Sequence, residues 1–169
     1  AGGWRCVCGG GEERGVAELD GMAPDGGGVR QVAAERRGAW RATGGSNSAE
    51  LAYPSSSGLG ADVHLRVVSL DGDGEGRIIT QPGSRDSRPS WATRGPLVTY
   101  DSNPGFTRRD IWLVDVDTGE KTRLMNTLPK DSWPDWDAHD AEIAFSTDAG
   151  EASHADIYAM SPVAAPCAE

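Results

Sequence analysis

The sequence lacks the patterns that a helical, membrane-spanning or nucleic-acid-binding protein would need. No segment shows the apolar periodicity of an amphipathic helix, so we expect almost no helix. No apolar run reaches the roughly 18 residues of a membrane-spanning helix, so we expect no membrane span. Only 16 scattered Lys and Arg stand against 26 Asp and Glu, and this net charge of −10 argues against nucleic acid as a partner.

Signatures of catalysis are also sparse. The sequence has 3 His residues and no Gly-x-Ser-x-Gly elbow that would present a serine nucleophile. We expect His154 on a solvated loop and His64 at a packing position, so neither predicts a general base. The sequence therefore predicts a protein without enzymatic activity and without a cofactor.

Two acidic segments offer the oxygen ligands that Ca²⁺ prefers. Residues 71–76 read Asp-Gly-Asp-Gly-Glu-Gly, but Pro82 stands at the twelfth position, where a calcium loop needs Glu. Residues 131–140 hold 4 Asp around Trp133 and Trp136. Because Asp is favoured in the turns that separate strands, we interpret both segments as turns and expect no metal site.

What the sequence does contain is an internal repeat. A Pro-x-Trp strand, an aromatic strand and an Asp-Ile strand recur in the same order at offsets of 45, 45 and 46 residues. They are Pro89-Ser90-Trp91, Val98-Thr99-Tyr100 and Asp110-Ile111-Trp112, then Pro134-Asp135-Trp136, Ile143-Ala144-Phe145 and Asp156-Ile157-Tyr158. A period of about 40 to 50 residues built from short strands is typical of β-propeller blades.

The first half of the chain carries looser copies of these landmarks. Residues 50–53 match residues 142–145, residues 62–65 match residues 110–113 at an offset of 48, and Trp40 takes the place of Trp91. A weaker first copy at residues 16–21 falls 47 residues before the copy that begins at Val63. The chain is therefore predicted to be a single β-propeller domain, with repeat units at residues 1–37, 38–87, 88–132 and 133–169.

The third unit shows its four strands most clearly. They are expected at residues 88–92, 97–101, 110–116 and 121–124, with residues 117–120 as a hairpin turn. Residues 111–114 are a continuous apolar run, which predicts that both faces of this strand are covered, as in stacked blades.

Counted by landmarks, the chain has fourteen strands. The predicted fold is all-β, in one of two arrangements. The first is a small β-propeller of about four blades, the first blade being incomplete. The second is an open propeller arc, with an apolar face that a partner must cover.

The pattern Pro-x-Trp, a turn, Ile-Ala-Phe-Ser and Asp-Ile-Tyr in residues 134–158 resembles the TolB-type β-propeller repeat. The resemblance is strong over residues 88–162 and extends more loosely toward the N-terminus. Where that family has Ser-Pro-Asp-Gly after the Trp, residues 137–140 and 92–95 keep a turn but not its usual residues. The resemblance implies a propeller of a periplasmic or extracellular protein that makes protein contacts, and it does not imply catalysis.

Repeated residues are expected to be structural, and unrepeated aromatic residues are expected to bind a partner. The repeated set is Trp40, Trp91, Trp136, Tyr53, Tyr100, Phe145, Asp62, Asp110 and Asp156. Trp133 and Phe106 have no repeated equivalent and lie beside Pro or Gly in predicted loops, and Trp4 lies near the N-terminus. Because aromatic anchors dominate interface energies, we expect these three to be partner-binding residues.

The ends of a propeller often meet in one blade, so the 3 Cys residues suggest a bond that would close a ring. Cys6 and Cys8 share one face of an extended strand, so only one of them would bond to Cys167. The other interpretation, metal or redox use of Cys-x-Cys, lacks further Cys or His at usable spacing. The chain begins at Ala1 without Met or a secretory apolar segment, which we interpret as a processed or trimmed end.

Two functions are compatible with these features. The first is a non-enzymatic extracytoplasmic β-propeller that acts as an accessory or scaffold subunit and binds a larger protein assembly. The alternative is a glycan-binding or hydrolase-associated propeller module, because an exposed Trp133 also suits sugar binding. The sequence favours the first function, since it offers no pair of carboxylates at a recognisable cleft.

Overall fold

The chain folds into strands and turns. The computed structural model describes residues 5–9, 17–22, 25–35, 41–45, 49–56, 62–71, 76–106, 108–126, 129–149 and 155–162, with only the backbone at 5–9, 17, 18, 34, 35 and 106. These residues form fourteen strands and one short 3-10 helix, η1 (Pro104–Phe106). None of the described residues belongs to a helix long and apolar enough to cross a membrane. The predicted all-β class is confirmed.

The strands form four antiparallel sheets, each made of strands that are consecutive in the sequence. Sheet 1 contains β1 (Arg5–Gly9), β2 (Ala17–Met22) and β3 (Arg30–Glu35). Sheet 2 contains β4 (Thr43–Gly44), β5 (Glu50–Ser56), β6 (Val63–Ser69) and β7 (Arg77–Ile78). Sheet 3 contains β8 (Ser87–Trp91), β9 (Leu97–Ser102), β10 (Asp110–Asp115) and β11 (Lys121–Arg123). Sheet 4 contains β12 (Asp131–Trp136), β13 (Ile143–Thr147) and β14 (Asp156–Met160).

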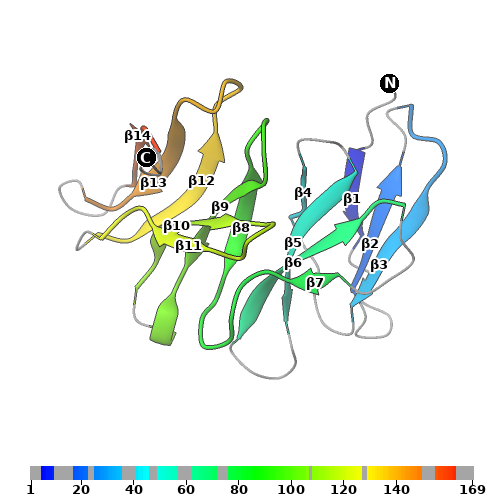
Figure 1. Cartoon of the computed structure of the whole chain (residues 1–169), viewed down its shortest axis with the longest axis horizontal. Helices are drawn as coiled ribbons and strands as arrows, with labels where there is room; N and C mark the ends of the chain where they lie inside the picture. Colours follow the sequence, from blue (N-terminus) through cyan, green and yellow to red (C-terminus); the bar gives the residue numbers. More distant parts are fainter. Residues whose placement is uncertain are drawn as a thin grey trace.

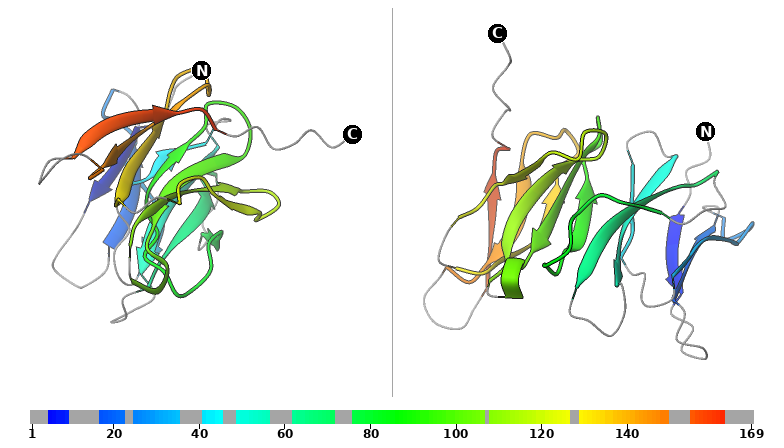
Figure 2. Two further views of the ribbon diagram at one scale, coloured as in Figure 1. Left: turned by 90° about the vertical axis from the view of Figure 1, so that its left-hand side faces the viewer. Right: turned by 60° about the horizontal axis from the view of Figure 1, so that its bottom comes forward.

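The four sheets stand in a row in the order of the sequence (Figure 1). Each contacts its neighbour, through β3 and β6, β5 and β8, and β9 and β12. Sheets 1 and 4 lie at opposite ends of the row in Figure 1 and in the right-hand view of Figure 2. Of the two predicted arrangements, the structure is the open arc of propeller blades.

One edge of the row is formed by the first strands of sheets 2, 3 and 4. Strand β8 contacts both β4 and β12, so these three strands lie next to one another although they belong to different sheets. We call β4, β8 and β12 the inner strands. They bring residues about 45 positions apart in the sequence to one surface.

Apolar side chains fill the spaces between the sheets in two clusters. Between sheets 1 and 2 the buried residues are Leu19, Val32, Ala33, Leu51, Tyr53, Val68 and Leu70. Between sheets 2 and 3 they are Ala52, Leu65, Val67, Ile79, Trp91, Val98, Tyr100, Val114 and Val116. Because neighbouring residues of one strand enter different clusters, a strand in the middle of the row is apolar on both faces.

Trp91 joins sheets 2 and 3. Its side chain is buried, its indole Nε1 donates to the Gly95 carbonyl at 3.1 Å, and its backbone N–H donates to Thr43 Oγ1 at 3.3 Å. The indole ring lies against Gly45, where a Cβ atom would approach the Trp91 ring to 3.3 Å. The glycine therefore provides the space that the ring fills.

Pairing register corrects two of the expected repeat equivalences in sheet 2. Trp91 lies opposite Val98, and the corresponding residue in sheet 2, opposite Leu51, is Gly44 and not Trp40. Trp40 itself lies outside the described residues. The sequence missed this shift because no Trp marks the true position. The turn itself has the same length in both sheets, since Gly44 and Leu51 are seven residues apart, as are Trp91 and Val98.

The second correction concerns the Asp-Ile strand. Asp110 lies opposite Ser102, and the corresponding residue in sheet 2, opposite Ser55, is His64. Asp62 precedes β6 by one residue and is half-buried. The β5–β6 hairpin is longer than the β9–β10 hairpin, so an alignment on the Asp residues is out of register by two.

Candidate binding site on the inner strands

Trp133 lies on inner strand β12 and not in the predicted loop. Its side chain is 45% exposed. Its backbone takes a φ of 60°, in the left-handed region that large side chains rarely adopt. The β12–β13 register shifts between Ser132 and Asp135, which marks a β-bulge at this residue. Such bulges redirect a side chain away from the normal alternation of a strand.

The same backbone feature occurs on all three inner strands. Arg88 has a φ of 54° and lies in the register shift between Ser87 and Ser90 of sheet 3. Arg41 also has a φ of 54° and lies two residues before β4. Each of the three residues stands two positions before a residue that pairs with the next strand of its sheet. These paired residues are opposite Ala52 in sheet 2, Thr99 in sheet 3 and Ala144 in sheet 4. Arg41, Arg88 and Trp133 are therefore structurally equivalent positions in three successive blades.

Arg41 and Arg88 both stack on the Trp133 ring. Their guanidinium carbons lie 4.0 Å and 4.2 Å from the ring centroid. A cation over an indole face is attracted by the ring quadrupole, by about 0.5 to 1 kcal/mol at exposed sites. The stack joins sheets 2, 3 and 4 at one point, and we call these three residues the Arg-Trp-Arg stack.

The Asp101 carboxylate holds Arg88 and Trp133 of the stack in position. This carboxylate is fully buried, and it accepts hydrogen bonds from Ser87 Oγ at 2.7 Å, Arg88 Nη1 at 2.6 Å and Arg109 Nη1 at 2.5 Å. It also accepts the Trp133 backbone N–H at 3.2 Å. One carboxylate thus holds the bulge of sheet 4 and the two arginines of sheet 3 in place. A buried ion pair with this many donors is costly to break, by about 3 to 5 kcal/mol.

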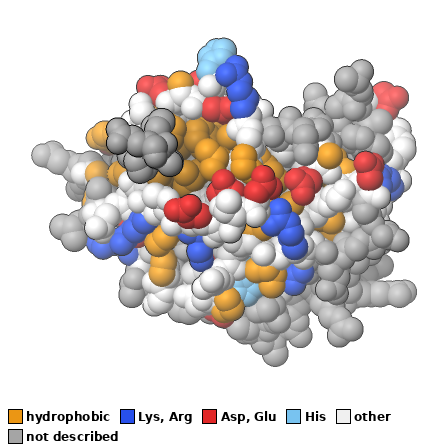
Figure 3. Space-filling view, in the orientation of Figure 1, with side chains coloured by type: hydrophobic (Ala, Val, Ile, Leu, Met, Phe, Trp, Pro, Cys, Tyr) orange, Lys and Arg blue, Asp and Glu red, His pale blue; other side chains and the backbone are white. Residues whose placement is uncertain are grey.

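A cavity of about 370 Å³ opens beside the stack, lined in part by Arg41, Arg85, Arg88, Arg109 and Trp133. A second, of about 480 Å³, adjoins it along β8 and β12 and shares Arg41, Arg88 and Trp133 with the first. Four of the 16 Lys and Arg of the chain therefore line one hollow. By contrast, the face seen in Figure 3 carries a row of Asp and Glu side chains across its middle.

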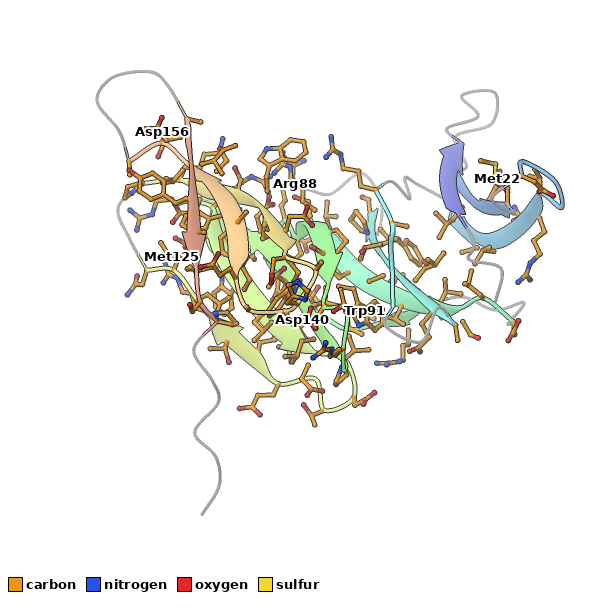
Figure 4. The ribbon with its side chains drawn as sticks, turned by 90° about the horizontal axis from the view of Figure 1, so that it is seen from above. Met22, Arg88, Trp91, Met125, Asp140 and Asp156 are labelled. Carbon is orange, nitrogen blue, oxygen red and sulfur yellow. The ribbon has the colours of Figure 1, made fainter. Side chains whose placement is uncertain are left out.

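The acidic segment after β12 forms turns that link sheets 3 and 4. Asp140 accepts hydrogen bonds from the Thr93 N–H and hydroxyl at 2.6 and 2.7 Å, and from the Arg94 N–H at 2.9 Å. Partial burial of Asp140 works against ionisation, but these three hydrogen bonds prevail and hold its pKa below the usual value. In Figure 4, Asp140 lies near Trp91 and away from Arg88. This link is separate from the Arg-Trp-Arg stack.

Asp137 organises the same loop from within. The Glu142 N–H donates to its carboxylate at 3.0 Å and lowers its pKa, as do the N–H groups of Ala141 and His139. The turn interpretation of this segment is confirmed at Asp137 and Asp140. Within the described residues, no group of three or more His, Cys, Asp or Glu is placed to hold a metal ion.

Comparison with known proteins places the sheets in a wider context. No protein-family model matches the chain. The Tol-Pal system protein TolB of Francisella tularensis subsp. holarctica is 27% identical over 115 residues, which are 66% of this chain and 26% of that protein. The TolB of subsp. mediasiatica is 26% identical over 96 residues, which are 57% of this chain and 22% of that protein. The chain spans about a quarter of the length of the curated relatives it matches.

Solved structures with the same fold include TolB proteins and a peptidase. TolB from Acinetobacter baumannii superposes with a TM-score of 0.75 at 17% identity, over 95% of this chain and 39% of that one. A protein described as TolB from Agrobacterium tumefaciens gives 0.79 at 16% identity, over 94% and 57%. A puromycin-hydrolysing peptidase of Mycobacterium tuberculosis gives 0.68 at 13% identity, over 94% and 27%.

The chain carries a TolB-like β-propeller repeat region. The resemblance read from the sequence is thereby confirmed, and the solved structures show the fold alone.

Within the TolB-like repeat region, most repeated aromatic residues are buried. Tyr53, Tyr100 and Phe145 are exposed by 5% or less. Trp136 is half-buried, Asp110 is buried and pairs with Arg123 at 2.6 Å, and Asp156 is exposed on the last strand. The repeat thus predicted the core well where a neighbouring sheet covers it.

The other expected site residues are only partly in view. Phe106 lies in η1, with its side chain outside the described residues, and Trp4 and Cys167 lie outside them altogether. The backbones of Cys6 and Cys8 lie in β1, opposite Gly21 and Leu19. Both the predicted disulfide and the partner-binding roles of Phe106 and Trp4 stay predictions.

Sequence reasoning found Trp133 but missed the rest of the site. Arg41, Arg88, Arg109 and Asp101 were not singled out, because none of them is a landmark of the repeat. A signal existed at one position, since Arg88 and Trp133 both directly precede the Pro of Pro-x-Trp. Arg41 is equivalent only in three dimensions, because β4 has no Pro-x-Trp.

Proposed function

We propose that this TolB-like repeat region is a non-enzymatic docking module that binds a protein partner through its inner strands. The single observation that supports this most is the exposed Trp133, which is stacked against Arg41 and Arg88 from two other blades. Tryptophan and arginine are enriched among the residues that carry most of the binding energy of protein interfaces. An aromatic residue fixed in position loses little conformational freedom when a partner covers it.

Strain in the backbone supports the same role. Three residues other than glycine have positive φ at equivalent positions, and such conformations cost of the order of 1 to 3 kcal/mol each. Natural sequences tend to retain such costs at binding sites, where they direct side chains toward a ligand. Here the three strained residues meet in one stack.

The relatives suggest the setting of this role. The curated relatives are named as members of a Tol-Pal system. We therefore propose that this chain has an accessory role in a larger assembly outside the cytoplasm. We propose a periplasmic or extracellular location on the same grounds.

Photocrosslinking tests the docking role. A photoreactive phenylalanine analogue replaces Trp133 in the cells that make the protein, and in a control it replaces Ile78, which is 53% exposed on the outer strand β7. We expect a protein adduct of discrete mass at position 133 and none at position 78. The same adducts at both positions, or none at position 133, would contradict the proposal.

A glycan-binding module is the second candidate, and the exposed Trp133 beside a cavity of about 480 Å³ favours it. Intrinsic fluorescence on titration with oligosaccharides tests it. A saturable change in the wild-type protein that disappears in Trp133→Leu would favour glycan binding over protein docking. We expect no such change.

A further inference from the structure

We propose that the cavity beside the Arg-Trp-Arg stack binds a carboxylate of an acidic peptide segment in the partner. This inference rests on the proposed docking function and specifies the chemistry of the partner. The chain is acidic overall, yet four arginines line one hollow of about 370 Å³.

One carboxylate already shows what the arginines recognise. Asp101 lies fully buried and receives Nη1 of both Arg88 and Arg109, at 2.6 and 2.5 Å. A guanidinium group has five N–H donors in a planar fork, and in the described part of the chain each of these two arginines donates only from Nη1. Their remaining donors suit a second carboxylate, because arginine matches carboxylates with paired hydrogen bonds.

Arg41 adds a third cation that Asp101 does not contact. Its only interaction with a described residue is the stacking on Trp133 at 4.0 Å. Arg88 and Arg109 have partly accessible side chains, at 26% and 19% exposure, so a ligand can reach them from the cavity. The guanidinium groups of Arg41, Arg88 and Arg109 outnumber the one Asp101 carboxylate, so the hollow carries a positive excess that attracts an anion.

The anchoring carboxylate is particular to this site and is not a feature of the repeat. The residue equivalent to Asp101 follows the aromatic landmark, and it is Pro54 in sheet 2 and Ser146 in sheet 4. Asp101 therefore occurs where arginines from the inner strands converge. Asp101 holds these arginines in position, and its single negative charge neutralises only one of their positive charges.

The ligand is a peptide carboxylate and not a lone small anion, because the recognition surface is long. The first cavity extends from the stack toward Ser56 and Val63, the second runs along β8 and β12, and the two share the stack as a common wall. The Trp133 ring adds an apolar surface beside the cations, which suits the methylene groups of Glu or Asp side chains. An extended segment reaches both cavities and places its carboxylate in the first, because Asp135 lines the second.

Calorimetric titration with a short, end-blocked oligoglutamate peptide tests the proposal, with oligoglutamine as the uncharged probe. We expect oligoglutamate to bind at an ionic strength of about 0.01 M, to weaken at about 0.1 M as screening increases, and oligoglutamine not to bind. Arg41→Gln should weaken binding about tenfold, which corresponds to about 1.4 kcal/mol. Arg41 makes no ion pair with a described residue, so this variant is expected to fold.

Arg94→Gln is the matched control, because it removes the same charge from an exposed loop of sheet 3, where its backbone N–H makes its only hydrogen bond to a described residue. Compared at an ionic strength of about 0.1 M, where the Debye length is about 10 Å, it should change the affinity less than about twofold because screening weakens the effect of a distant charge on the cavity. Equal weakening by both variants would overturn the proposal, because it would reveal a general charge effect. Failure of oligoglutamate to bind would also overturn it, as would an Arg41-dependent response to inorganic phosphate alone.

The two proposals fail separately. A protein adduct at position 133 without oligoglutamate binding would preserve the docking role and reject the acidic chemistry. Oligoglutamate binding without an adduct would establish the carboxylate site and reject docking of a protein on Trp133.

Discussion

At the residue scale, two tryptophans that look alike in the sequence have opposite roles. Trp91 is 7% exposed and fills the space over Gly45 between sheets 2 and 3. Trp133 is 45% exposed and contacts arginine side chains at the surface. The repeat distinguishes the two, because Trp91 recurs as Trp136 whereas Trp133 is equivalent to Arg88.

We therefore expect Trp91→Ala to lower the free energy of unfolding by about 3 to 5 kcal/mol, since it leaves a cavity between two sheets. Trp133→Ala removes partly exposed surface and two cation contacts of about 0.5 to 1 kcal/mol each, so it should cost about 1 to 2 kcal/mol. Urea denaturation of both variants measures the difference. Equal losses would contradict the separation of roles.

Asp140 is the second residue whose surroundings predict a measurable effect. Its carboxylate ties the turn of sheet 3 to the loop of sheet 4, and its pKa in the folded protein is lowered. Because the pKa is lower in the folded than in the unfolded protein, ionised Asp140 stabilises the fold at pH values above the usual Asp pKa of about 3.8. This stabilisation is lost as the pH falls through the lower pKa of the folded protein.

Asp140→Ala should accordingly lower the melting temperature near neutral pH, and the gap from the wild type should narrow below pH 3.8. Asp117→Ala is the control, because the Asp117 carboxylate makes no hydrogen bond to a described residue. Only the backbone N–H of Asp117 donates one, to Asp115 Oδ1. Thermal unfolding followed by circular dichroism at several pH values measures both. A gap that stays constant down to low pH would refute the role of the ionised carboxylate.

At the element scale, one position of the Asp-Ile strand appears in two environments. Ile111 of β10 faces sheet 4 and is fully buried, whereas its equivalent Ile157 of β14 is 82% exposed. Thr99 and Ala144 form a second such pair, buried and exposed. The apolar run of a middle strand thus reflects a neighbour on each side, and β14 carries the same sequence without one of these neighbours among the described residues.

Ile111→Ala should destabilise the protein by about 2 to 5 kcal/mol, because it leaves a cavity between sheets. Ile157→Ala should change stability by less than about 0.5 kcal/mol. Chemical denaturation of this matched pair measures the coverage of each sheet. A large loss for Ile157→Ala would mean that the face of sheet 4 is covered in solution.

Strands and turns were the part of the fold that the sequence predicted best. The four strands of sheet 3 begin and end within one residue of their expected positions. Gly119, with a φ of 75°, completes the predicted hairpin turn. Sheet 2 was read out of register at two positions. At Trp40 the reason is that no Trp stands at the equivalent position 44, and at Asp62 the reason is that the β5–β6 hairpin is longer than the β9–β10 hairpin. The strained Arg88 and the anchoring Asp101 were invisible, since bulge geometry and contacts between sheets depend on the folded chain.

At the scale of the whole molecule, the open row of sheets leaves the outer face of sheet 4 without a neighbour among the described residues. The face of sheet 4 that carries Ile157 corresponds to the faces that are buried in the middle of the row. Exposed apolar faces of this kind favour association.

We expect the isolated chain to self-associate with increasing concentration, and Ile157→Lys to shift it toward the monomer. Size-exclusion chromatography with light scattering measures the mass, and reducing and oxidising conditions separate contributions from Cys6, Cys8 and Cys167. A monomer at every concentration would contradict the expectation, as would equal association of the Ile157→Lys variant.

In our proposal, three blades together present one binding surface at the Arg-Trp-Arg stack. The most direct measurement is a two-dimensional NMR titration with end-blocked oligoglutamate that follows the side-chain N–H signals of Arg41, Arg88 and Trp133. We expect the three signals to shift together with one dissociation constant, while the Trp91 indole signal does not move. Shifts confined to one blade, or centred on the Asp140 loop, would contradict it.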